Sequence, residues 1–134
     1  MKLLRLLALA ALILAVAARP SAAQGGTYNH AAFEKVMDVA MKNLRVVMGS
    51  LIAGDWAKVG ASAEALASDA KTIRGLTPKA SPERIGEFQA HADSLASRSA
   101  RVAAAAKARA QGPAGEGLGE IVQSCMGCHS VFRK

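Results

Sequence analysis

Apolar side chains recur every third or fourth residue in four successive stretches of this sequence, and short breaks separate the stretches. This spacing places the apolar residues on one face of a helix, whereas a strand would alternate them. The stretches run from 29 to 53, from Asp55, from Ser81, and from about Glu116 to Phe132. Because short connections make successive helices antiparallel neighbours, the pattern predicts an all-α, up-down-up-down four-helix bundle. An ordinary bundle or coiled coil without a cofactor would carry the same stripes.

Helix-end signals mark the breaks between the stretches. Gly54 and Gly75 are expected to end the first and second helices, and Asp55 and Ser81 are expected to cap the second and third. The run Gly-Pro-Ala-Gly at residues 112–115 is expected to separate the third helix from the fourth.

Aromatic side chains are scarce, at 4% of the 134 residues. A sandwich or barrel of strands draws on many aromatic and β-branched residues, so this composition favours helices. A core with so few aromatics either consists of small aliphatic side chains or is completed by something other than side chains.

Residues 1–23 have the pattern of a secretory signal peptide. Two basic residues precede an apolar run from Leu6 to Ala17, and small residues lead to an expected cleavage after Ala23. An uncleaved anchor is the alternative, although the run is short against the roughly 20 residues of a membrane span. After this cleavage we expect residues 24–134 to form one domain in the periplasm, without membrane contact. The cleavage lowers the formal net charge of +7 by three, and no tight Lys/Arg cluster indicates nucleic-acid binding.

The sequence Cys-Met-Gly-Cys-His at residues 125–129 has the C-x-x-C-H spacing of a c-type haem attachment site. On a helix, Cys125, Cys128 and His129 share one face. The two thiols can form thioethers to the haem vinyl groups while the imidazole binds iron from the same side. A disulfide at this spacing would close almost no loop. A redox dithiol is expected in a βαβ setting, and a zinc site needs a second ligand pair that the sequence does not offer.

The other axial position of the iron is expected to face the first helix. In an antiparallel bundle the end of the fourth helix lies beside the beginning of the first, where His30, Met37 and Met41 occur. Met37 fits the inward stripe, Met41 follows one turn later, and an empty position is also compatible. Met48 lies about 16 Å further along the axis than Met37 and is expected to fill the core.

Two segments resemble the cytochrome c-prime family of haem-binding four-helix bundles. The run from Cys125 to Lys134 matches the family ending C-x-x-C-H-x-x-F/Y-R/K, and the stretch from Met37 to Val47 is similar to the first helix of its low-spin, Met-ligated members and of the related b-type bundle cytochrome. The resemblance implies one covalent haem c, with His129 as the proximal ligand and Met37 as the distal one. Met41 is the second choice.

The distal ligand decides the expected function. Iron bound by both His129 and Met37 is low-spin, and a thioether favours its ferrous state, which suits a one-electron carrier and not an enzyme. Iron with an open distal position would instead bind nitric oxide or carbon monoxide, and this gas-binding role is the alternative. A peroxidase would need polar distal groups, for which His30 is the single candidate.

Basic residues are expected near the haem end of the bundle. Arg133, Lys134, Lys35 and Lys42 could steer a redox partner with an acidic surface, although a solvated helix surface would have the same charges. Arg133 is also expected near the proximal ligand or the haem propionates. His91 is expected to be a half-buried or surface residue without a ligand role. The chain is expected to be a monomer or a homodimer.

Overall fold

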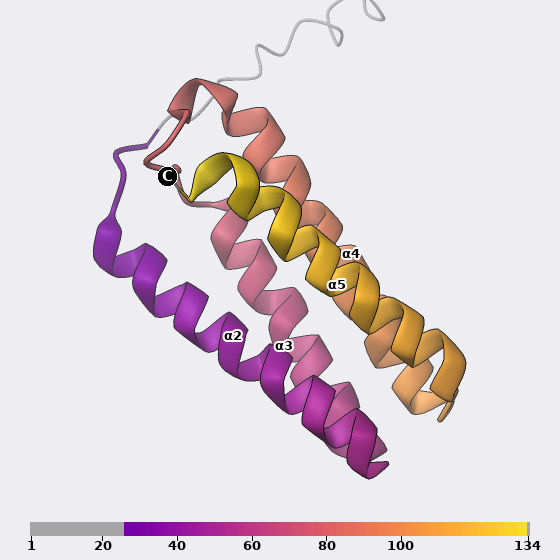
Figure 1. Cartoon of the computed structure of the whole chain (residues 1–134). Helices are drawn as coiled ribbons and strands as arrows, with labels where there is room; N and C mark the ends of the chain where they lie inside the picture. The colour runs from indigo at the N-terminus through magenta and orange to yellow at the C-terminus, as the bar shows by residue number, and fades with distance from the viewer. Residues whose placement is uncertain (1–25, 134) are drawn as a thin grey trace, which may run out of the picture.

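The computed structural model describes residues 26–133, which form four α-helices and contain no strand. The helices are α2 (His30–Ala53), α3 (Trp56–Arg74), α4 (Ile85–Lys107) and α5 (Gln111–Phe132), and the 3₁₀ turn η1 (Pro82–Arg84) leads into α4. Figure 1 shows them lying side by side along one long direction. The predicted all-α class is confirmed. The signal-peptide prediction falls outside the described residues, and no helix in the described part is long and apolar enough to cross a membrane.

Small aliphatic side chains make up most of the core between the helices. α3 packs on both α2 and α4, and α4 packs on α5, whereas α2 and α5 touch each other much less. The predicted stripes of α3 and α4 are buried apart from their first residues, Trp56 and Ile85, which are half-buried, so helical periodicity identified the inward faces. The buried members of these two stripes are Val59, Ala63, Leu66, Ala70, Ile73, Phe88, Ala92, Leu95, Ser99, Val102 and Ala106.

The first two helices begin and end where the sequence predicts. The Asn29 carboxamide oxygen accepts from the Ala32 amide (3.0 Å) at the start of α2. Gly54 ends α2 in the left-handed region, with φ of 71°, which favours glycine. The Asp55 carboxylate then caps α3 by accepting from the Lys58 amide (3.1 Å).

Ser81 does not act as the predicted side-chain cap. Its backbone is left-handed, with φ of 54°, and its hydroxyl makes no capping hydrogen bond. A capping Ser81 hydroxyl would accept a hydrogen bond from the Arg84 amide. This amide donates instead to the Ser81 carbonyl (2.9 Å). The chain therefore enters α4 through the turn η1.

The predicted break at residues 112–115 is also wrong, because these residues lie inside α5. The helix begins at Gln111, so Pro113 falls in its first turn. The amides of a first turn have no intrahelical acceptor, and a proline there removes no hydrogen bond. The real break lies at 108–110, where Arg109 has a φ of 49°.

Gly117 allows α4 and α5 to approach closely. A Cβ atom there would lie 2.6 Å from Cγ2 of Val102, which is fully buried and cannot move aside. We expect Gly117→Ala to lower the free energy of unfolding by about 1–2 kcal/mol, despite the better helix propensity of alanine. A Cβ on Gly119 meets nothing within 4 Å, so Gly119→Ala should raise it by up to about 1 kcal/mol. Urea denaturation measures both, and equal effects would contradict the close approach.

Candidate functional site

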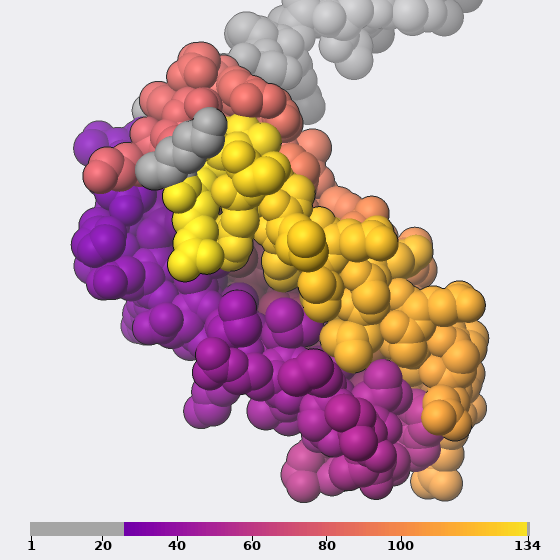
Figure 2. Space-filling model, viewed as in Figure 1, coloured from indigo at the N-terminus to yellow at the C-terminus, as the bar shows by residue number. Residues whose placement is uncertain are grey.

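A cavity of about 540 Å³ lies at one end of the bundle, and all four helices contribute to its walls. The first half of α2, the second half of α3, the first half of α4 and the end of α5 line it. Figure 2 shows the hollow between the end of α5 and α2, the two helices that touch least. The volume is in the range of cofactor pockets.

Four of the five aromatic residues gather at this cavity. Tyr28 packs on Phe33 (5.5 Å between ring centroids), Phe33 on Phe88 (5.9 Å) and Phe88 on Phe132 (5.3 Å), and all four line the cavity. They come from the lead-in to α2, from α2, α4 and α5. The scarce large side chains are therefore concentrated at this end of the bundle, around an open volume.

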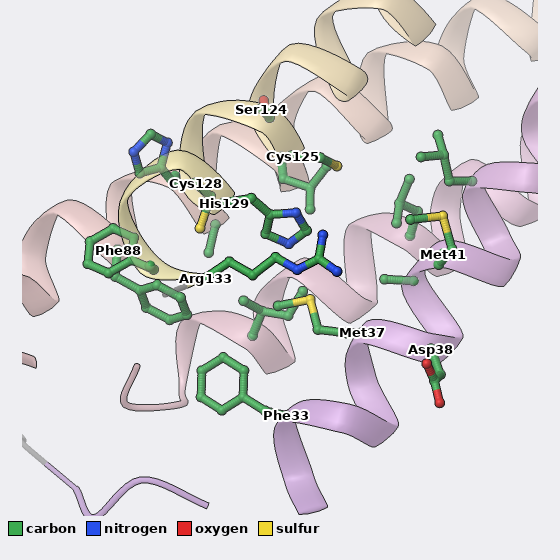
Figure 3. A pocket seen from close by; sticks show the side chains of 18 of the residues that line it. Phe33, Met37, Asp38, Met41, Phe88, Ser124, Cys125, Cys128, His129 and Arg133 are labelled. Atoms are coloured by element: carbon green, nitrogen blue, oxygen red, sulfur yellow. The ribbon is translucent and has the colours of Figure 1, made fainter. Parts of the chain in front are cut away.

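The C-x-x-C-H residues occupy the last two turns of α5. Cys125, Cys128 and His129 are half-buried and line the cavity, in keeping with the shared helix face that their spacing predicted. Both cysteines are free thiols. Met126, between them in sequence, is 67% exposed and does not line the cavity. In Figure 3 the His129 imidazole points into the open space, and the thiols of Cys125 and Cys128 lie along the same side of α5.

Burial keeps the two thiols and the imidazole of the motif uncharged at neutral pH. It raises the pKa of the Cys125 thiol, and burial together with the neighbouring Cys125 raises the pKa of Cys128 to about 11. Reactive dithiols show the opposite shift, which a helix N-terminus or a nearby cation produces. Burial, and secondarily the charge of Arg133, lowers the pKa of His129. At neutral pH the imidazole is therefore uncharged, which is the form that binds a metal.

The raised thiol pKa predicts slow alkylation of Cys128 in haem-free protein. A Cys125→Ala variant isolates this thiol, and iodoacetamide reacts only with the thiolate. We expect the alkylation rate of the folded variant to keep rising well above pH 9. The pKa of Cys128 is about 11 when Cys125 is present, and burial, the main cause of this shift, remains in the variant. In urea, which unfolds the protein, the midpoint of the plot of rate against pH should fall to the ordinary thiol pKa of about 8.5. A folded-state midpoint at or below that value would contradict the burial.

Two methionines of α2 reach the cavity. Met37 is half-buried and packs against the core, whereas Met41 is 41% exposed, although both line the cavity. Figure 3 shows the Met37 thioether directed toward the space into which His129 points. Met48 is 49% exposed and is not part of the lining, so its predicted role as core filler is wrong. It lies on the outer side of α2, facing solvent.

His30 lines the cavity from the first turn of α2, but its ring nitrogens have other partners. Its Nδ1 lies 3.0 Å from the Tyr28 hydroxyl, and its Nε2 lies 3.6 Å from the Glu34 carboxylate. These contacts hold the ring at the exposed rim of the site.

The sequence did not identify His91 as a residue of this cavity. It is half-buried on α4 and lines the cavity, with its ring 6.2 Å from that of Phe132. Its Cε1 would lie 3.4 Å from a Cβ on Gly127, so it packs against the attachment motif. His91 follows the core residue Phe88 by three residues, which places both on one helix face. This spacing could have predicted that His91 faces inward.

Only part of the predicted basic surface lies at the cavity. Arg133 lines the cavity, and so does Lys79, which was not predicted. Lys35 and Lys42 are exposed and lie outside the lining, while Lys134 falls outside the described residues.

Within residues 26–133, no group of three or more His, Cys, Asp or Glu side chains could hold a metal ion by itself. Comparison of the chain with protein-family models, curated proteins and solved structures found no match. The family resemblance of the sequence therefore stays a prediction.

Proposed function

We propose that residues 24–134 form a periplasmic c-type cytochrome that carries single electrons between redox proteins. In this proposal the chain is an antiparallel up-down-up-down bundle with one covalent haem c, exported by a signal peptide that is cleaved after Ala23. The observation that carries the proposal is the placement of Cys125, Cys128 and His129 on one side of α5, along a cavity of about 540 Å³.

The residues present fit a haem in three respects. The cavity has a suitable volume and aromatic walls for a flat apolar ring. Cys125 and Cys128 are free thiols at its edge, available for thioether bonds. His129 is kept neutral and points into the cavity. The bound haem would supply an iron that alternates between ferric and ferrous states.

Met37 is the distal ligand in this proposal, and Met41 is the second choice. Burial against the core fixes the Met37 side chain in the cavity, whereas Met41 is more exposed. A thioether is a weak, soft ligand, and pairing it with imidazole raises the reduction potential. Because α2 and α5 hold the two side chains, little has to move when one electron is gained or lost.

The surface near the site suits a partner with acidic groups. Arg133 and Lys79 bring two positive charges to the cavity lining against the one negative charge of Asp38, and charge complementarity speeds the encounter of redox proteins. The association rate with such a partner should fall as ionic strength rises.

The absorption spectrum of the purified, oxidised protein tests this function. We expect a low-spin spectrum with a far-red sulfur-to-iron band and reversible one-electron reduction. A high-spin spectrum that changes on addition of carbon monoxide would contradict the carrier proposal and support the gas-binding alternative.

A further inference from the structure

Arg98 of α4 connects this helix to the turn of α5 that precedes the attachment motif. Its Nη1 donates to the Glu120 carbonyl (2.7 Å) and to the Ser124 hydroxyl (2.7 Å). Ser124 is buried, lines the cavity and directly precedes Cys125. Arg98 does not line the cavity itself, but its guanidinium binds Ser124, which does.

The positive charge of Arg98 has no acidic counter-ion within the described residues. Both of its acceptors are neutral oxygens, and the carboxylate of Glu120 pairs instead with Arg101, one turn further along α4. Arg98 is part-buried, whereas Arg101 is exposed. Water therefore screens the charge of the exposed Arg101 more strongly than that of the part-buried Arg98.

An uncompensated cation beside a redox centre favours the state that carries one more electron. The electrostatic energy of a ferric centre near a positive charge is higher than that of a ferrous centre, because reduction removes one positive charge. We propose that Arg98 is a positioning residue that holds Ser124 at the cavity and whose charge raises the reduction potential of the haem. This inference rests on the proposed function.

The test compares two charge-matched variants of the haem-loaded protein by redox titration. We expect Arg98→Gln to lower the equilibrium constant for one-electron reduction about fivefold, which corresponds to about 40 mV. Arg101→Gln removes the same charge from the same helix and should change that constant less than about 1.5-fold. Arg98→Lys keeps the charge and should restore most of the wild-type value.

Other outcomes distinguish a failure of this inference from a failure of the haem proposal. Equal potentials in Arg98→Gln and the wild type, or equal shifts in Arg98→Gln and Arg101→Gln, would overturn it while leaving the haem proposal intact. If Arg98→Gln does not fold, Arg98→Met removes the charge with a long side chain that can still pack, and it should lower the potential in the same direction; an unchanged or raised potential would overturn the inference. A wild-type protein without haem would overturn both proposals.

Discussion

Replacing Cys125 and Cys128 together with alanine is expected to abolish covalent haem attachment. The two thiols are the single pair of cysteines in the chain, and both line the cavity beside His129. Without them no thioether can form, so acidic organic solvent should extract all haem from the variant. The wild type should keep essentially all of its haem through the same extraction, and denaturing gels stained for haem measure the difference.

Met126→Ala provides the matched control within the same motif. Its side chain is 67% exposed and lies outside the cavity lining, so the variant should retain covalent haem like the wild type. Haem that resists extraction in the double cysteine variant would contradict the attachment site. Loss of haem in Met126→Ala alone would show that the motif contributes more than its cysteines and histidine.

Met37→Ala is expected to convert the iron from low-spin to high-spin. An alanine side chain cannot reach the iron, and water or an empty position would then give a weaker ligand field. The visible spectrum should lose its sulfur-to-iron band, and carbon monoxide should bind the reduced variant readily. Electron paramagnetic resonance of the oxidised protein measures the spin state directly.

Met41→Ala is the control for this prediction, because Met41 lies one turn later on the same helix and also lines the cavity. We expect it to remain low-spin. The reverse result would assign the distal position to Met41. Low-spin spectra in both variants would show that neither thioether is needed by itself. If the double variant is low-spin as well, attention moves to His30, whose present contacts to Tyr28 and Glu34 would have to break.

Local sequence signals predicted the helices well where one residue determines the local geometry. Gly54 takes a left-handed φ, and Asp55 accepts a hydrogen bond from a backbone amide. Both effects depend only on residues close by in the sequence. The errors occurred at Ser81 and Pro113, where the local signal had two outcomes. A backbone carbonyl replaced the expected cap at Ser81, and Pro113 is as compatible with a first helical turn as with a break.

The site was predictable for the motif residues of α5 and for His30, Met37 and Met41 of α2, which the sequence placed at the same end and which line the same cavity. The shared face of Cys125, Cys128 and His129 follows from their spacing in α5. The gathering of the aromatics, the part played by His91 and the opening between α2 and α5 depend on how separate helices pack. Sequence periodicity indicates which face of a helix is buried, but not whether a neighbouring side chain or an open volume lies against it.

The intact mass of the denatured protein, after expression together with a haem attachment system, shows whether the chain carries a covalent haem. We predict a mass that exceeds the polypeptide by one haem, with absorbance in the haem region that stays with the protein. A mass equal to the polypeptide alone, without that absorbance, would rule out covalent haem attachment.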